Sequence, residues 1–210
     1  MSGVREIETP HGRARAHTTE PAGTVRGTLV LGHGAGGGVE SPDLVAVTAG
    51  AAAAGWRVVR VEQPWRVAGK RIAVAPPKLD EGWGAVLHRL RADDVLSGPL
   101  VLGGRSAGAR VACRTAAEHG ATGVLALAFP LHPPGKPERS RAAELTAVPV
   151  PLVVVQGETD AFGGPAEVAA ALTGTGASVH PVPGDHSLKR NAEVVAAAAL
   201  SWLEGLLGPS

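Results

Sequence analysis

Short apolar runs alternate with longer alanine-rich segments along the chain. The runs are rich in β-branched residues and almost continuously hydrophobic, which is typical of parallel strands covered by helices on both faces. We predict strands at residues 28–32, 57–62, 99–103, 124–129, 151–156 and 178–182. The segments between them predict helices at about residues 41–54, 80–94, 106–119, 138–146, 165–173 and 188–205. This alternation predicts a three-layer α/β fold, with a mostly parallel central sheet and helices on both of its faces.

Signals at the ends of these segments support the same architecture. Ser41 before Pro42 suits a helix N-cap followed by proline at the first helical position, and Pro165 suits that position too. The first 20 residues predict one or two antiparallel strands at the edge of the sheet. No internal repeat or charge run marks a boundary, so we predict a single domain over residues 1–210.

Composition narrows the classes of partner. The chain has 20 basic and 19 acidic residues and a formal net charge of +1, so no overall field favours nucleic acid or an anionic membrane. Residues 1–20 are polar and lack the apolar core of a signal peptide, and the apolar stretch at residues 194–203 is too short to span a bilayer. We expect a cytoplasmic protein that acts on a small molecule. A protein partner is not indicated.

The cysteine and histidine content argues against a metal centre. Cys113 has no second cysteine in the chain, which excludes an intrachain disulfide and a cysteine-based zinc site. We expect it to be a small buried helix residue. No spacing among the histidines is typical of a metal site, so we expect neither a metal nor another cofactor.

The chemistry is carried by a G-x-S-x-G motif formed by Gly104, Ser106 and Gly108. It follows a predicted strand and precedes a predicted helix, which is the context of the nucleophile elbow of α/β-hydrolases. Such an elbow exposes the serine hydroxyl above the carboxyl edge of the sheet. The flanking glycines allow neighbouring backbone to approach closely.

A serine nucleophile needs a base and a group that orients this base. In this fold the chain order is nucleophile, acid, histidine. Asp160 follows the strand predicted at 151–156, and His186 follows the last predicted strand, so both fall at the carboxyl edge. We therefore predict the triad Ser106, Asp160 and His186.

Weaker candidates remain for two of these roles. Glu158 lies in the same loop as Asp160 and could serve as the acid. Asp185 would have to fold back on its neighbour His186, so a solvated or turn-capping role is favoured. His132 follows a predicted strand and is a candidate for lining the cleft, but it precedes the acid in the chain.

Acyl transfer also needs donors for the oxyanion. One is expected to be the backbone N–H of Ala107, directly after the nucleophile. The other is expected from the glycine-rich loop at 32–38, with Ala35 as first choice and Gly34 as second. We expect His33 to brace this loop by hydrogen bonds.

The same loop supports a rival interpretation. Gly32, Gly34 and Gly37 match the G-x-G-x-x-G pattern of dinucleotide-binding Rossmann proteins, and Glu62 ends the next strand. However, the next helix begins only at Pro42, so a phosphate would not sit directly on a helix end. The Rossmann alternative also leaves the elbow, Asp160 and His186 unexplained.

Four segments resemble a particular group of small α/β-hydrolases: residues 33–38, 63–71, 103–110 and 129–163. This group includes a testis-expressed protein and the regulatory third subunit of the nonspecific-lethal acetyltransferase complex, and it is related to dienelactone hydrolases. The resemblance covers about residues 25–190 and implies the same triad. Ala109 departs from the pattern, which often has a second glycine there. Members that serve as complex subunits keep open a second hypothesis, a noncatalytic interaction protein.

Two further features concern the substrate. The segment from 63 to 79 is basic (Arg66, Lys70, Arg71 and Lys78), and Arg105 and Lys136 lie in segments near the same edge. A cationic rim for an anionic substrate is one interpretation, but we favour a solvated loop. Only about 20 residues separate Phe129 from the next strand, which predicts no cap domain. The sequence thus predicts a serine hydrolase for a small ester or thioester, without specifying which.

Overall fold

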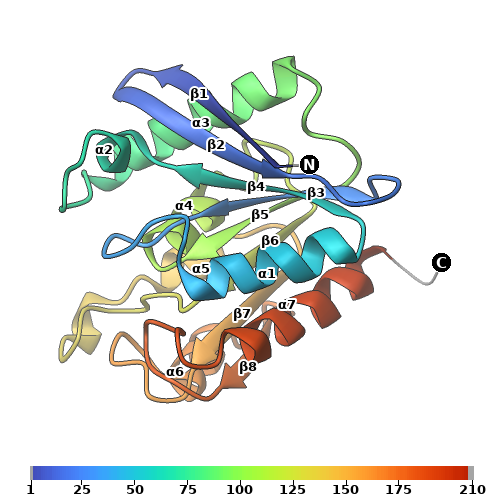
Figure 1. Ribbon diagram of the computed structural model, residues 1–210. Helices are drawn as coiled ribbons and strands as arrows, with labels where there is room; N and C mark the ends of the chain where they lie inside the picture. The colour runs from blue at the N-terminus through green and yellow to red at the C-terminus, as the bar shows by residue number, and fades with distance from the viewer. Residues whose placement is uncertain (1, 208–210) are drawn as a thin grey trace.

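The computed structural model describes residues 2–207, and within them eight strands form one sheet (Figure 1). The strands are β1 (Ser2–Thr9), β2 (Gly12–Thr19), β3 (Gly27–Gly32), β4 (Trp56–Glu62), β5 (Leu100–Arg105), β6 (Gly123–Leu127), β7 (Leu152–Gly157) and β8 (Ser178–Val182). The helices are α1 (Pro42–Ala53), α2 (Pro64–Val67), α3 (Pro76–Ala92), α4 (Ala107–Thr115), α5 (Ala142–Thr146), α6 (Pro165–Ala171) and α7 (Ala192–Leu207). A short 3₁₀ helix, η1, spans Pro137–Arg139.

The strand order is β1-β2-β4-β3-β5-β6-β7-β8. The hairpin β1–β2 is antiparallel and joins β4 antiparallel, while all neighbours from β4 to β8 are parallel. The prediction of a mostly parallel sheet with antiparallel strands at one edge is therefore confirmed. Because β3 to β8 run in one direction, their carboxyl ends meet along one edge.

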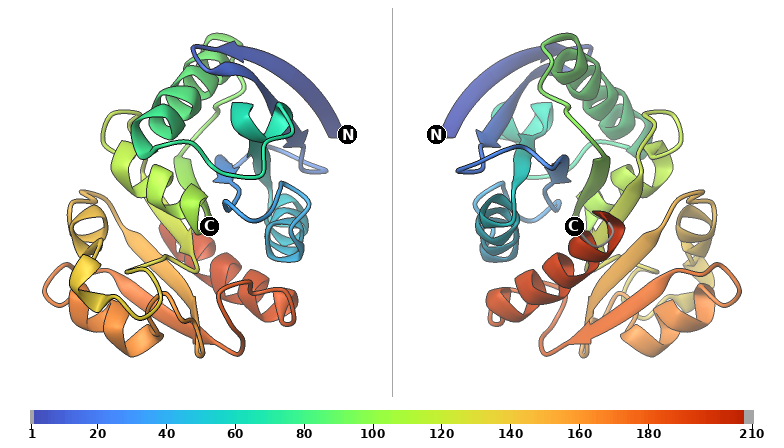
Figure 2. Two further views of the ribbon diagram at one scale, coloured as in Figure 1. Left: turned by 90° about the vertical axis from the view of Figure 1, so that its left-hand side faces the viewer. Right: turned by 90° about the vertical axis from the view of Figure 1, so that its right-hand side faces the viewer.

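Alternate residues of each inner strand face opposite layers. In β3, Leu29 and Leu31 pack toward α1 and α7, whereas Val30 packs toward α3 and α4, and all three are fully buried. Figure 1 shows α1 and α7 side by side across one face of the sheet, and Figure 2 shows α3 and α4 on the other face. Covering both faces explains why the strands are hydrophobic at consecutive positions.

The helix boundaries differ from the sequence prediction where proline or glycine intervenes. The helix predicted at 80–94 begins earlier, at Pro76, because proline fits the first turn, where an amide has no partner. The segment predicted as one helix at 138–146 is η1 followed by α5. The last helix begins at Ala192 instead of residue 188. Helix α2, a single turn that begins at Pro64, lies in a segment where the sequence predicts no helix.

The elbow helix is also shorter than predicted. It ends at Thr115 and continues as turns to residue 120, where Gly120 has a positive φ of 63°. Cys113 lies on this helix and is 4% exposed, as expected for a small core residue. Ala109 is fully buried there, so the helix accommodates its methyl group.

The connection between β6 and β7 stays short. It contains η1 and α5 and no larger insertion, which agrees with the prediction of a fold without a cap. None of the helices among residues 2–207 combines the length and apolar character needed to cross a membrane.

Candidate active site

Ser106 occupies a sharp turn between β5, which ends at Arg105, and α4, which begins at Ala107. Its φ is 54° and its ψ is −108°, a conformation that L-residues rarely adopt. Such strain costs about 1–3 kcal/mol and persists only where the surroundings impose it. Here the Ser106 amide donates to the carbonyl of Leu127 at 2.9 Å, which fixes the turn to the end of β6.

The two glycines of the motif allow β3 to pass close to the turn. A Cβ at Gly104 would lie 2.3 Å from the carbonyl oxygen of Gly32, and one at Gly108 would lie 2.2 Å from the same atom. Neither methyl group fits without moving backbone. Gly32 contributes to the same contact, because its own Cβ would lie 3.0 Å from the Cα of Gly108. The elbow therefore depends on three glycines from two strands and a helix.

The structure brings the three predicted triad residues into one chain of hydrogen bonds. Ser106 Oγ lies 2.9 Å from His186 Nε2, and His186 Nδ1 lies 2.8 Å and 3.0 Å from the two oxygens of Asp160. This geometry fits a neutral imidazole whose Nδ1–H donates to Asp160 and whose Nε2 accepts the serine proton. The side chain of Asp160 is completely buried, while that of His186 remains 20% exposed.

Asp160 is held by donors that the sequence analysis did not identify. Gln156, the fully buried penultimate residue of β7, donates from Nε2 to Asp160 Oδ2 at 2.9 Å. The Phe162 amide donates to Oδ1 at 2.8 Å. Gln156 also donates to the Gly163 carbonyl and accepts from the Phe129 amide. It therefore connects the loop that carries Asp160, here called the acid loop, to the end of β6. A polar residue closing an otherwise apolar strand was the available signal.

The loop of the acid also contacts the imidazole face. The ring of Phe162 stacks on His186, with 4.1 Å between ring centroids and 30° between planes. The stacking and the Asp160 hydrogen bonds together fix the position of the imidazole. The Nε2 atom is thereby directed at Ser106.

The other candidates for the acid lie elsewhere. Glu158 is exposed to solvent, and Asp185 is exposed and accepts hydrogen bonds from the amide and hydroxyl of Ser187. These bonds lower the pKa of Asp185, so it stays ionised in a turn-capping role. Neither carboxylate bonds to His186 among the described residues.

His33 holds the glycine-rich loop after β3 in place by two hydrogen bonds. Burial lowers the pKa of His33, which keeps its ring neutral. Its Nδ1–H donates to the Gly34 carbonyl at 3.0 Å, and its Nε2 accepts from the Gln63 amide at 3.1 Å. The loop then carries Ala35 and Gly36 to the cavity above Ser106.

The two backbone amides predicted as oxyanion donors, those of Ala35 and Ala107, are free to bind another group. Among the described residues, the backbone amides of Ala35 and Ala107 make no hydrogen bond. Ala107 opens α4, so its N–H belongs to the first turn of the helix, whose amides lack intrahelical partners. The carbonyl of Gly34 accepts from the Gly37 amide, which shapes the loop as a turn.

A cavity of about 560 Å³ opens directly over Ser106 and His186. Its walls come from the glycine-rich loop, the acid loop and the segment after β8. The residues that line it are Ala35, Gly36, Arg105, Ser106, Thr159, Ala161, Phe162, Asp185, His186, Ser187 and Lys189.

The three candidate rim residues have different positions. Arg105 is not on an exposed rim: its side chain is 7% exposed and lies below the glycine-rich loop, 3.4 Å from Asp43. Arg66 is half-buried and lines a neighbouring cavity. His132 is buried, with Nδ1 on the Pro133 carbonyl and Nε2 on Glu167, and it does not line the cavity over Ser106. Arg105 is buried and not exposed on a rim because it ends a central strand, where side chains are covered from both sides.

A model of a protein family, described as an alpha/beta hydrolase domain, matches residues 25–201. This match covers most of the chain. The chain belongs to the α/β hydrolase family. No curated protein matches the sequence.

Solved structures support the fold of this family member. An alpha-beta serine hydrolase homologue from Coxiella burnetii superposes with a TM-score of 0.81 at 19% identity, over 96% of this chain and 97% of that one. A serine hydrolase without lid from Xanthomonas campestris gives 0.80 at 20% identity, over 100% and 96%. A dienelactone hydrolase from Anabaena variabilis gives 0.74 at 18% identity, over 97% and 96%. At such identities the likeness establishes the fold alone.

The described part of this hydrolase-fold chain offers no metal centre. No group of three or more His, Cys, Asp or Glu side chains within residues 2–207 is arranged to hold a metal ion.

Proposed function

We propose that the protein is a serine hydrolase that cleaves a small ester or thioester. The observation that carries the proposal is the continuous hydrogen-bond chain from Ser106 through His186 to Asp160, in which each distance is between 2.8 and 3.0 Å. This is the arrangement that a serine needs to become a nucleophile near neutral pH. Membership of the α/β hydrolase family supports it.

The reaction proceeds through a covalent acyl-enzyme. Ser106 Oγ attacks the carbonyl carbon of the substrate while His186 Nε2 accepts the serine proton. The tetrahedral intermediate collapses as His186 returns this proton to the leaving alcohol or thiol. A water molecule, deprotonated by His186, then attacks the acyl group. The second tetrahedral intermediate collapses as His186 returns this proton to Ser106 Oγ, which releases the acid and free Ser106.

Asp160 and the loop amides support both steps. Asp160 accepts the Nδ1–H bond, orients the ring and stabilises the imidazolium that forms transiently. The amides of Ala107 and Ala35, with Gly34 as the alternative to Ala35, donate to the negative oxygen of the tetrahedral intermediate. Each such donor is usually worth about 3 kcal/mol of transition-state stabilisation.

A fluorophosphonate probe tests the proposal directly. We expect one adduct per chain on Ser106, detected by mass spectrometry, and no adduct in Ser106→Ala. Ser187→Ala is the matched control, because Ser187 also lines the cavity and labelling should persist without it. A folded wild-type protein that resists the probe would favour the noncatalytic alternative, an interaction protein with a hydrolase fold.

The site geometry adds no observation in favour of the two alternatives. A noncatalytic role leaves the assembled triad without a purpose. The Rossmann hypothesis is opposed by family membership and by the glycine-rich loop itself, whose next helix begins only at Pro42.

The resemblance to the branch of the testis-expressed protein and the nonspecific-lethal subunit is a proposal at a finer level. It rests on the segments at 33–38, 63–71, 103–110 and 129–163. Two of these segments contact each other, because Arg105 packs against Gly34 and Gly37.

A further inference from the structure

A second cavity of about 330 Å³ lies beside the cavity over Ser106. Lys189 lines both, so the two adjoin at this side chain. The wall of the second cavity, here called the side cavity, consists of Gly37, Gly38, Val39, Glu40, Ser41, Pro42, Glu62, Arg66 and Lys189. The triad makes no use of it.

The two cations of the side cavity have no carboxylate partner. No Asp or Glu oxygen among the described residues lies within salt-bridge distance of Arg66 or Lys189.

The two acids of the same wall are already paired elsewhere. Glu62 faces Arg15 at 3.7 Å and His17 at 3.6 Å, and Glu40 faces Arg60 at 3.4 Å. The uncompensated charge in the side cavity is therefore positive.

A third cation lies beneath the loop that forms one wall. A Cβ at Gly37 would lie 2.6 Å from Arg105 Nη2, so the guanidinium rests directly against this residue. More than nine-tenths of the Arg105 side chain is buried, and its Nε, which makes no hydrogen bond among residues 2–207, lies 3.4 Å from the carboxylate of Asp43. Arg105 also lines the cavity over Ser106. Because Asp43 pairs with this guanidinium, the unpaired positive charge beside the side cavity comes from Arg66 and Lys189.

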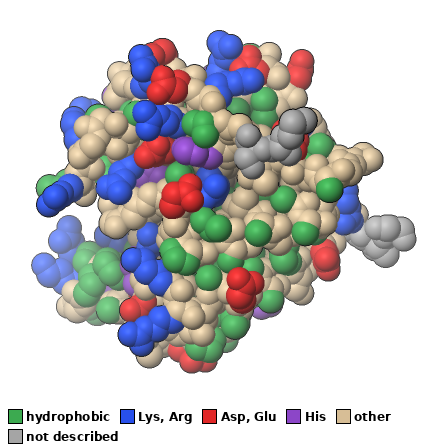
Figure 3. All heavy atoms as spheres, viewed as in Figure 1, with side chains coloured by type: hydrophobic (Ala, Val, Ile, Leu, Met, Phe, Trp, Pro, Cys, Tyr) green, Lys and Arg blue, Asp and Glu red, His purple; other side chains and the backbone are tan. Residues whose placement is uncertain are grey.

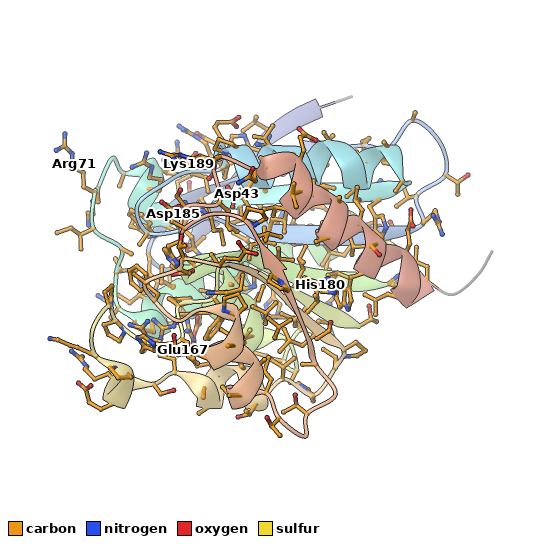
Figure 4. All side chains as sticks on the ribbon, turned by 90° about the horizontal axis from the view of Figure 1, so that it is seen from below. Asp43, Arg71, Glu167, His180, Asp185 and Lys189 are labelled. Atoms are coloured by element: carbon orange, nitrogen blue, oxygen red, sulfur yellow. The ribbon has the colours of Figure 1, made fainter. Side chains whose placement is uncertain are left out.

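Basic side chains also gather on the surface around the side cavity. Figure 3 shows Lys and Arg side chains gathered on the side of the molecule where the parallel strands end. In Figure 4, Arg71 extends away from the body of the protein, which fits a solvated position. Lys189 is also exposed to solvent, although it lines both cavities. Lys70, Arg71 and Lys78 are exposed, while Arg66 from the same segment is half-buried. The basic segment is thus largely solvated, but Arg66 faces a cavity.

We propose that the side cavity binds a carboxylate carried by the substrate, at the end opposite to the ester that Ser106 attacks. The inference rests on the proposed hydrolase function and defines its substrate as the monoester of a dicarboxylic acid or a similar anionic ester. Arg66 supplies a planar fork and Lys189 a point charge at the boundary between the cavities. Glu40 and Glu62 in the wall disfavour a dianionic phosphate, so a monoanion fits best.

Matched pairs of esters test this. Mono-p-nitrophenyl esters of adipate, pimelate and suberate are compared with the same compounds whose free carboxylate is methylated, after subtraction of spontaneous hydrolysis. We expect kcat/KM of the wild type to favour the anionic member at least tenfold at one chain length. The preference should shrink in 0.5 M NaCl, since salt screens attraction between partly exposed charges.

Substitutions locate the site. Lys189→Met and Arg66→Met should each bring the ratio of the two kcat/KM values toward one. Arg190→Met is the control: Arg190 is exposed, adjacent to Lys189 and outside both cavities, so this variant should retain the wild-type ratio. A wild-type ratio near one at every length, or an equal loss in Arg190→Met, would overturn the carboxylate site.

Binding without turnover separates this inference from the proposed function. Calorimetry of wild type with adipate should give binding that Lys189→Met and Arg66→Met weaken and Arg190→Met does not. If Ser106 resists the fluorophosphonate probe, the hydrolase proposal fails, yet adipate binding still decides the anion site. Binding of inorganic phosphate in preference to adipate would contradict the assignment to a carboxylate.

Discussion

The carbonyl oxygen of Gly32 occupies the space that a Cβ at Gly104 or Gly108 would need. The turn at Ser106 therefore requires that both residues are glycine. Gly108→Ala should lower the free energy of unfolding by about 3 kcal/mol or more, because overpacking here meets backbone. Gly205→Ala is the control, since Gly205 lies in α7 with open space at its Cβ, and alanine there should stabilise by up to about 1 kcal/mol. Urea denaturation measures both, and equal stability of the two variants would contradict the contact.

Ser106→Ala and Asp160→Asn should differ in severity. The first should lower kcat of an activated ester by several orders of magnitude with the fold intact, because the triad acts as a unit. Asp160→Asn should lose less. Gln156 and the Phe162 amide both donate to the acid, so an Asn must turn its NH₂ toward a donor or toward His186 Nδ1.

Glu158→Gln is the control for the acid, because Glu158 is exposed and should tolerate the change. A silent Asp160→Asn together with a crippling Glu158→Gln would move the acid to Glu158. Unchanged turnover in Ser106→Ala would remove the serine from the mechanism.

For single residues, the sequence predicted where the site residues lie better than it predicted which other residues they contact. The triad candidates could be located because each follows a recognisable strand, and the parallel sheet brings strand ends together. The sequence does not predict the roles of Gln156 and Arg105, because these depend on contacts between segments. Gln156 bonds to Phe129 and Asp160, and Arg105 packs under Gly37. No local pattern encodes such contacts.

Among the elements, three helices are joined by one ion network. Glu144 of α5 accepts from Arg110 at 2.5 and 2.8 Å and from Arg114 at 3.1 Å, and Arg114 also binds Asp80 of α3. Burial acts to raise the pKa of Glu144, but the hydrogen bonds and charges of Arg110 and Arg114 outweigh it, and the pKa is lowered.

Glu144→Gln should therefore destabilise the protein by about 1–3 kcal/mol near pH 7. Because the folded-state pKa lies below the unfolded one, this stabilisation is present above the usual Glu range and is lost as the pH falls through the folded value. Urea denaturation at pH 7 and pH 3.5 should give a difference from wild type that shrinks at low pH. Glu138→Gln in η1 is the control, since Glu138 is exposed. A difference that grew on acidification would exclude this network as its source.

The elements themselves were predictable to the extent that hydrophobic period and proline mark them. The strands could be predicted because burial on both faces of the sheet makes them hydrophobic at consecutive positions. The long helices α1, α3 and α7 could be predicted from the segments between these strands. The first and last residues of the helices were predicted less accurately. Pro76 starts α3 within a segment interpreted as loop, and the single turn α2 is too short to show a period.

The whole molecule has an open site, and this predicts its preference for chain length. Only η1 and α5 lie between β6 and β7, so no lid encloses a long acyl chain. Each exposed methylene forgoes up to about 0.8 kcal/mol of transfer free energy. We expect kcat/KM for neutral p-nitrophenyl esters to favour acetyl to butyryl over chains of ten carbons or more. A steady rise toward long monomeric chains would mean that an apolar tunnel forms during binding.

Cys113, the single cysteine of the chain, makes the opening of the molecule observable without any substitution. Burial raises the pKa of its thiol to about 12, so at pH 8 a disulfide reagent can modify it only while α4 is open. The modification rate then reports how often the helix that follows Ser106 leaves the sheet. A phosphonate adduct on Ser106 that slows this rate would mean that the reacting centre and its supporting helix open as one cooperative unit. An unchanged rate would mean that α4 opens independently of what is bound above it.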